Sequence, residues 1–306
     1  MTKKMKMKRI LTLGSSIVLG GMIVLSAALA SANTTTGYEE LKSTIKNMAQ
    51  VKSFTGVLNA SIKDNGKALV EINAGIKTNE DTRDGSAKAS ISSNGTKEDF
   101  EVYKQDGKLI FKTNGSETYN VAEEPENSND DRFDNDEKKC DPEAMAIGEK
   151  IMDFVVGDLK NQVEIKENDG EKIISMNLSE KEIPTIANLI ASLAVKEKAE
   201  RNPEDVAKLE NTLGIKTDLM PEMPRLVDDV RIENVEFTVT VGKDGMVKNL
   251  SGNAVLAGND EKGTFHKVEF DFTMSLSNVN STVPEKIDLT GKQVKNVDVT
   301  ELRDED

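Results

Sequence analysis

Two hydrophobic periods alternate along this chain. In residues 38–51 the apolar positions recur every three or four residues, which is the spacing of one face of an α-helix. From residue 54 to about residue 120 apolar and polar residues alternate, as in strands with one buried face. The pattern predicts one amphipathic helix followed by β-hairpins. The helix stripe consists of Tyr38, Leu41, Ile45, Met48 and Val51.

The first predicted hairpin spans residues 53–79. Its apolar residues occupy even positions on both strands, and such matching requires a loop with an odd number of residues. Residues 65–67 supply a three-residue loop with a glycine that can adopt positive φ. The residues expected to share one face are Leu58, Ala60, Ile62, Val70, Ile72, Ala74 and Ile76.

The hairpin at residues 100–115 reverses at an Asp-Gly pair, residues 106–107. This pair is typical of a two-residue turn, which fixes the register of the two strands. We therefore expect Val102 to lie opposite Phe111 and Phe100 to lie opposite Thr113.

After residue 141 the period changes again. Helices are predicted over 142–162, 183–195 and 203–214, with a hairpin over 162–178. Residues 234–277 then alternate as three long strands. On the last of these strands one face is expected to carry His266, Val268, Phe270, Phe272, Met274 and Leu276.

These elements predict an α+β fold. A large antiparallel sheet with one apolar face tends to curl, and the helices can cover its concave side. We expect a single domain over residues 33–306, with an acidic flexible loop at 122–142 and a frayed tail at 299–306. The predicted architecture is a curved antiparallel sheet, a half-open β-barrel, with helices packed on the concave face.

The segment from 38 to about 120 resembles the opening of the LolA-like lipoprotein-carrier proteins and their LppX-like relatives. The resemblance is carried by the helix, by Val51, Ser53 and Phe54 after it, and by the successive hairpins. It implies a half-open β-barrel whose helices form a lid over an apolar cavity for acyl chains. Envelope-stress sensor domains share this fold. The present chain is longer, and no residue in it matches the functional polar positions of the carriers.

Residues 1–32 have the composition of a secretory signal peptide. A basic segment precedes an apolar run and a small-residue site at 30–32. We expect cleavage after Ala32 and a secreted, extracytoplasmic protein of the cell envelope. An uncleaved anchor is the alternative, because the apolar run approaches the roughly 20 residues that span a bilayer. No later segment is apolar enough to cross a membrane, so no transmembrane span is expected after signal removal.

The charge of the chain excludes some partners. Its formal net charge is −14. Without residues 1–32, which contain five basic and no acidic residues, 35 basic residues stand against 54 acidic ones and the net charge is −19. Such a chain is not expected to bind nucleic acid or an anionic membrane surface through charge.

The chain contains few residues of the types that usually serve in catalysis or metal binding. His266 is its sole histidine and lies on an apolar strand face, which favours a hydrogen-bonded core or rim residue. Cys140 is the sole cysteine and has no histidine near it in sequence. The acidic loop lacks the Gly and Glu of an EF-hand, which favours a solvated linker over a Ca²⁺ site. We expect no enzyme activity, no catalytic residue, no metal site and no cofactor.

Two functions remain. The first is a binding protein that shelters a lipid or other apolar small molecule in a cavity between sheet and helices. The second is an envelope sensor or adaptor that binds a protein partner through the sheet. The 183–195 helix is either a lid or an ordinary core helix, and Met220 and Met223 either adapt to a ligand or pack a loop. The candidate cavity or lid residues are Ile186, Leu189, Ile190, Leu193, Phe270, Phe272, Met274, Met220 and Met223.

Overall fold

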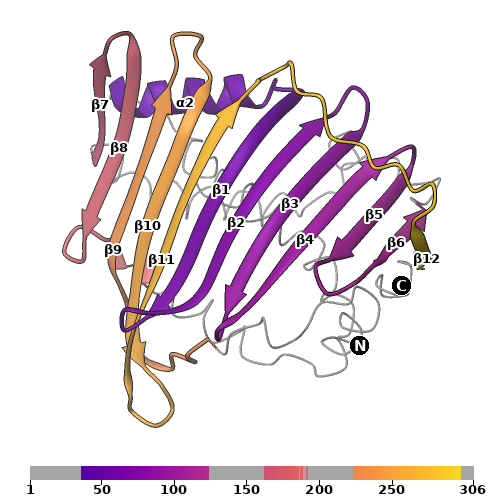
Figure 1. Ribbon diagram of the computed structural model, residues 1–306. Helices are drawn as coiled ribbons and strands as arrows, with labels where there is room; N and C mark the ends of the chain where they lie inside the picture. Colours follow the sequence, from indigo (N-terminus) through magenta and orange to yellow (C-terminus); the bar gives the residue numbers. More distant parts are fainter. Residues whose placement is uncertain (1–35, 124–161, 186, 189–190, 192–222, 298–306) are drawn as a thin grey trace, which may run out of the picture.

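The computed structural model describes residues 36–123, 162–185, 187–188, 191 and 223–297. They form one 12-stranded, largely antiparallel sheet that does not close (Figure 1). The strand order is β12-β6-β5-β4-β3-β2-β1-β11-β10-β9-β8-β7. The large antiparallel sheet predicted from the sequence is confirmed. The described part is mostly β, with a single short helix, α2 (Thr36–Met48).

The strands fall into two meanders that follow chain order. The first meander contains β1 (Ser53–Asp64), β2 (Lys67–Asn79), β3 (Asp84–Ser93), β4 (Thr96–Gln105), β5 (Lys108–Thr113) and β6 (Thr118–Glu123). The second contains β7 (Val163–Asn168), β8 (Glu171–Ser179), β9 (Asp228–Val241), β10 (Val247–Asn259) and β11 (Phe265–Ser277). Antiparallel pairing of β1 with β11 joins them in the middle of the sheet. A short strand, β12 (Gln293–Asn296), adds to β6 in parallel.

Turn chemistry explains the registers of the hairpins. Between β4 and β5, residues 106–107 both have positive φ, and the predicted pairs Val102–Phe111 and Phe100–Thr113 are confirmed. The three-residue loop predicted at 65–67 is wrong. Asp64 pairs with Lys67 across a two-residue turn, and a β-bulge after Ile62 supplies the extra residue instead. The even positions therefore still share a face.

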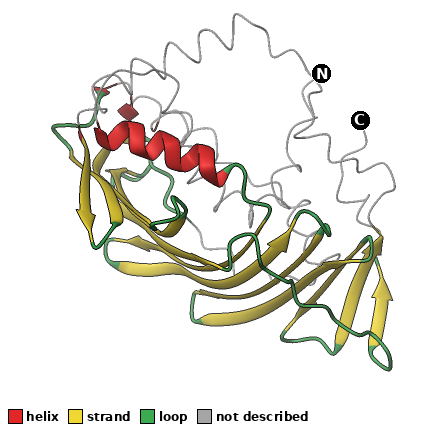
Figure 2. Cartoon of the chain, turned by 90° about the horizontal axis from the view of Figure 1, so that it is seen from above, coloured by secondary structure: helices red, strands yellow, loops and turns green. Residues whose placement is uncertain are grey.

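The main core lies between α2 and one face of the sheet, which we call the apolar face (Figure 2). The predicted helix is confirmed, although it ends at Met48, before Val51. An acidic residue in the first turn and Lys46 in the last turn complement the helix dipole. The Glu40 carboxylate lies 2.8 Å from Lys172 Nζ of β8. The buried cluster contains Tyr38, Leu41, Leu58, Ile174, Val239, Val241, Val247, Leu250, Met274 and Leu276.

The opposite face, which we call the polar face, is not polar throughout. On β4–β6 it carries a second buried cluster of Tyr103, Ile110, Tyr119 and Val121. Residues 278–292, which we call the C-terminal strap, run over this side of the sheet to β12 (Figure 1). Ile287 and Leu289 of the strap pack against the cluster. The alternation predicted one buried face of the sheet, and the strap buries part of the other face as well.

Polar contacts hold the strap in place. The two carboxylate oxygens of Glu285 lie 3.0 Å from Lys77 Nζ and 2.8 Å from Lys88 Nζ. These lysines, Lys88 first, lower the pKa of Glu285. The Gln105 side chain accepts a hydrogen bond from the Ile287 N–H at 2.7 Å and donates one to the Ile287 carbonyl at 3.0 Å. The strap is therefore fixed across three strands.

Several predicted segments lie outside the described residues. They are the signal segment 1–32, most of the acidic loop, the helices over 142–162 and 203–214, and the tail 299–306. The acidic loop was expected to begin at residue 122, but Ala122 and Glu123 belong to β6, and Ala122 is buried.

Candidate functional site

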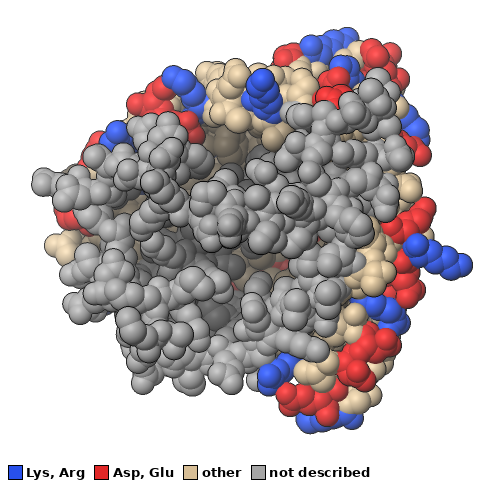
Figure 3. All heavy atoms as spheres, turned by 180° about the vertical axis from the view of Figure 1, so that it is seen from behind, with Lys and Arg blue, Asp and Glu red and all other residues tan. Residues whose placement is uncertain are grey.

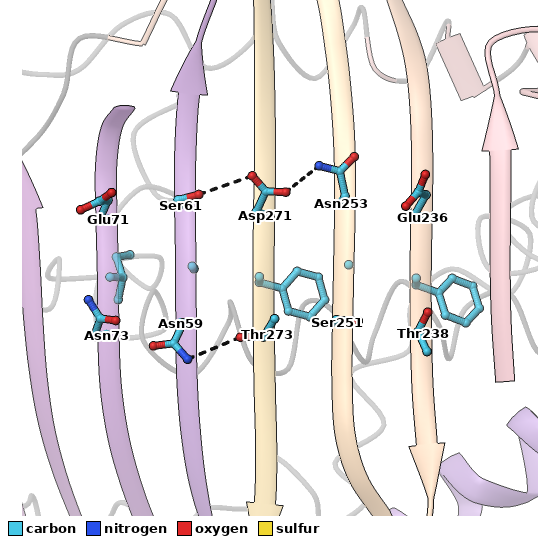
Figure 4. Close-up of a pocket in the computed structure, with 15 residues that line it drawn as sticks. Asn59, Ser61, Glu71, Asn73, Glu236, Thr238, Ser251, Asn253, Asp271 and Thr273 are labelled. Carbon is cyan, nitrogen blue, oxygen red and sulfur yellow. Dashed lines mark hydrogen bonds between the residues drawn. The ribbon is translucent and has the colours of Figure 1, made fainter. Parts of the chain in front are cut away.

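A groove crosses the polar face in the middle of the sheet. Its volume is about 520 Å³, and it spans β2, β1, β11, β10 and β9 (Figure 4). The central row of the groove is the set of residues that pair with one another across these strands: Ile72, Ala60, Phe272, Gly252 and Phe237. On each strand, the residues immediately before and after this row point to the polar face and form the two walls of the groove, because alternate residues point to the same face. One wall contains Glu71, Ser61, Asp271, Asn253 and Glu236, and the other contains Asn73, Asn59, Thr273, Ser251 and Thr238.

Asp271 is the centre of the polar network in this groove. It accepts hydrogen bonds from Asn253 Nδ2 at 2.7 Å, from Lys63 Nζ at 3.1 Å and from Ser61 Oγ at 3.5 Å. The Asn253 bond, followed by the contact with Lys63, lowers the pKa of Asp271. The carboxylate is thus a fixed acceptor at neutral pH.

Much of the hydrogen-bonding capacity of the groove is unused. Among the residues that the structure describes, the side chains of Glu71, Asn73, Thr238 and Ser251 have no hydrogen-bond partner. The walls offer amides, hydroxyls and carboxylates, and no histidine or cysteine lines the groove. These groups can donate hydrogen bonds to a polar partner and accept them from it.

The structure brings three of the predicted site residues together on the apolar face of β11. Phe270, Phe272 and Met274 pair with Ile62, Ala60 and Leu58 of β1, respectively. Their environments differ. Met274 is 2% exposed in the core under α2, whereas Phe270 is 37% exposed.

The Phe272 ring packs against a glycine on the neighbouring strand. The ring lies over Gly252 of β10, where a Cβ atom would contact Cε1 and Cζ of the ring. The close approach of this aromatic side chain therefore explains why position 252 is a glycine.

The 183–195 segment is described only at its start. Thr185, Ala187, Asn188 and Ala191 are helical, and Ile183 before them is buried. The Asn188 Oδ1 atom accepts a hydrogen bond from the Ile232 N–H at 2.7 Å, which ties this turn to β9. Met223 is half-buried. The remaining candidates, Ile186, Leu189, Ile190, Leu193 and Met220, lie outside the described residues.

His266 forms a small half-buried network at the start of β11. Its Nδ1 atom lies 2.8 Å from Asp64 Oδ2, and its Nε2 atom lies 3.5 Å from Asp260 Oδ2. The expectation of a hydrogen-bonded core or rim histidine is confirmed. Within the described ranges, no group of three or more His, Cys, Asp or Glu residues could hold a metal ion. The same residues include no helix long and apolar enough to cross a membrane.

Two buried polar residues on the apolar face were missed by the sequence analysis. Ser93 at the end of β3 is 3% exposed and Glu98 of β4 is 4% exposed. The signal was present, because Glu98 occupies an even position in line with Phe100 and Val102.

Comparisons with known proteins do not assign the chain to a family. No protein-family model and no curated protein matches it. One solved structure, a bifunctional dehydratase-cyclase domain in ambruticin biosynthesis, is 13% identical, with 85% of this chain and 88% of that chain covered and a TM-score of 0.13. Another, an N-terminal dehydratase from the difficidin assembly line, is 10% identical over 78% and 82% of the two chains, with a TM-score of 0.12.

Proposed function

We propose that this protein is an exported, non-catalytic binding protein of the cell envelope that shelters a lipid or other apolar ligand against the apolar face of its sheet. The observation that carries the proposal is the extent of this face beyond α2. The helix contacts β7 and β8 and closes the core near them, whereas the apolar row continues over β11, β1 and β2. Phe270 lies in that row and is 37% exposed.

The finer architecture belongs to the same proposal. A half-open barrel, with helices over its concave side, would enclose the apolar row that α2 leaves open. Around the outline of the molecule on this side, Lys and Arg side chains lie beside Asp and Glu side chains (Figure 3). The resemblance of residues 38–120 to the LolA-like carriers leads to the same function.

Burial alone can supply the affinity. Each methylene group removed from water contributes about 0.8 kcal/mol, so ten methylenes contribute on the order of 8 kcal/mol. Association lowers this gain by several kcal/mol through lost translational and rotational freedom. About 4 kcal/mol then remains, so roughly millimolar binding of a ten-methylene chain is expected without any covalent chemistry, and longer chains should bind more tightly.

The first experiment is organic extraction of the purified protein followed by mass spectrometry, with titration of a fluorescent fatty acid. We expect a co-purified apolar molecule and saturable binding of the probe. Phe270→Glu should weaken probe binding at least tenfold, because a carboxylate would enter the apolar row.

Val57→Glu is the matched control for that substitution. Val57 lies on the polar face of β1 and is 51% exposed, so the same added charge should leave probe binding unchanged. An empty extract together with absence of probe binding would contradict the proposed function.

The groove on the polar face favours a second candidate function, an envelope sensor or adaptor that binds a protein partner through the sheet. Its walls carry side chains with unused hydrogen-bonding capacity across five central strands. This function would become the leading one if the extraction and the fatty-acid titration both fail.

A further inference from the structure

Two neighbouring polar groups are buried on the apolar face without a partner. The Oε2 atom of Glu98 and the Oγ atom of Ser93 have no hydrogen-bond partner. Both residues are more than nine-tenths buried. Among the described residues, three other buried atoms also lack a hydrogen-bond partner: Thr44 Oγ1 of α2, and Asp64 Oδ1 and His266 Nε2, whose side chains bond to each other through other atoms. Two other buried serines of the sheet are satisfied. Ser53 Oγ accepts a hydrogen bond from the Thr282 N–H, and Ser86 Oγ accepts one from the Glu285 N–H.

The strand register places the two groups side by side. Ser93 pairs with Thr96 on β4, and Glu98 is the next residue of β4 on the same face. Diagonal neighbours of this kind are about 7 Å apart, within reach of one small head group. Val70 of β2 lies opposite Ser93, and Ile91 of β3 lies opposite Glu98. The polar pair is therefore set within an apolar surface.

A buried polar group without a hydrogen-bond partner destabilises the folded state. About nine-tenths or more of the buried polar groups in native proteins have a partner. Two adjacent exceptions on the face proposed to hold a ligand indicate that the missing partner comes from the ligand. The carboxyl group of Glu98 presents an oxygen acceptor, and the Ser93 hydroxyl can donate or accept.

The chemistry of the pair selects among head groups. An anionic head, such as a carboxylate or phosphate, would face the Glu98 carboxyl, and no described Lys or Arg forms an ion pair with Glu98. A primary amine supplies several hydrogen-bond donors and a positive charge for the carboxyl group. Its hydrocarbon chain would extend along the apolar row toward Phe270.

We propose that the sheltered ligand is a long-chain aliphatic amine, with its nitrogen held by Glu98 and Ser93 and its chain on the apolar face. This inference rests on the proposed function, because it names the head group of the same ligand. The binding is non-covalent, and no proton transfer or bond formation is involved.

The test compares two probes of equal chain length, dodecylamine and dodecanoate, titrated calorimetrically into the purified protein below their micellar concentrations. We expect dodecylamine to bind at least tenfold more tightly than dodecanoate. Glu98→Gln should abolish this preference, and Ser93→Ala should weaken dodecylamine binding severalfold.

Glu269→Gln is the matched control, because Glu269 of β11 lies on the polar face outside the groove, and the same chemical change there should leave both affinities unchanged. Equal binding of both probes to the unsubstituted protein would overturn the inference and leave the proposed function standing. Binding of neither probe would overturn the proposed function itself. If Glu98→Gln does not fold, the Ser93→Ala result decides, and unchanged dodecylamine binding by that variant overturns the inference.

Discussion

At the scale of single residues, Asp271 shows how one carboxylate organises the polar face. Its pKa is lowered by Asn253 first and by Lys63 next, so its interactions stabilise the folded state when the group is ionised. That stabilisation is present above the pKa of the unfolded chain, near 4, and is lost as the pH falls through the lower pKa of the folded protein.

Asp271→Asn should therefore reduce stability at pH 7 and make the loss of stability below pH 4 less steep. Because the side chain is 39% exposed, solvent screening limits the effect to about 0.5 kcal/mol. Urea unfolding at pH 7 and at pH 3 measures both changes. A difference between variant and parent that does not shrink at the lower pH would contradict the assignment.

Gly252 gives a second prediction at this scale. Gly252→Ala places a Cβ atom against the ring of Phe272, so we expect a loss of about 1–3 kcal/mol through overpacking. Gly75→Ala is the control, because a Cβ atom there meets no atom within 4 Å and should be neutral or slightly stabilising. Thermal denaturation of both variants tests this, and equal melting temperatures would show that the ring simply moves aside.

At the scale of elements, sequence patterns predicted the hairpins better than the strap. An Asp-Gly pair restricts the turn conformation locally, so the register of Val102 with Phe111 followed from residues a few positions away. The bulge after Ile62 could not be predicted in this way. A loop with an odd number of residues and a two-residue turn with a bulge place the same residues on one face, so the alternation does not distinguish them. The strap has no period of its own, and its partners lie about 180 residues away.

The strap can be tested through Gln105, whose side chain makes two hydrogen bonds to the backbone of Ile287. Gln105→Ala should lower stability by about 1–2 kcal/mol, since both bonds are lost. Hydrogen exchange should quicken in β12 and stay unchanged in β1. Lys295→Ala, at an exposed position of β12, should change neither quantity. Unaltered exchange in β12 of the Gln105 variant would mean that the strap is held by its apolar contacts alone.

At the scale of the whole molecule, the order of the strands in the sheet cannot be predicted from local sequence patterns. Alternation tells which residues share a face, but it does not tell which strands are neighbours. The pairing of β1 with β11 joins residues more than 200 positions apart. The polar groove was not predicted for the same reason, because its walls come from five strands that only this order brings together. Phe270, Phe272 and Met274 were placed on one face correctly because they belong to one strand.

The seam between β1 and β11 has a consequence for how the protein is made. Each meander can form as its own hairpins emerge, but β1 has an open hydrogen-bonding edge until β11 arrives to cover it. A chain that crosses a membrane from its N-terminus would deliver β1 early and β11 near the end of translocation. The native sheet would then be completed only in a late step of folding, when β11 pairs with β1 and β12, at the end of the strap, pairs with β6 at the far edge. Until that step, the waiting edge of β1 would be the natural place for a chaperone to bind.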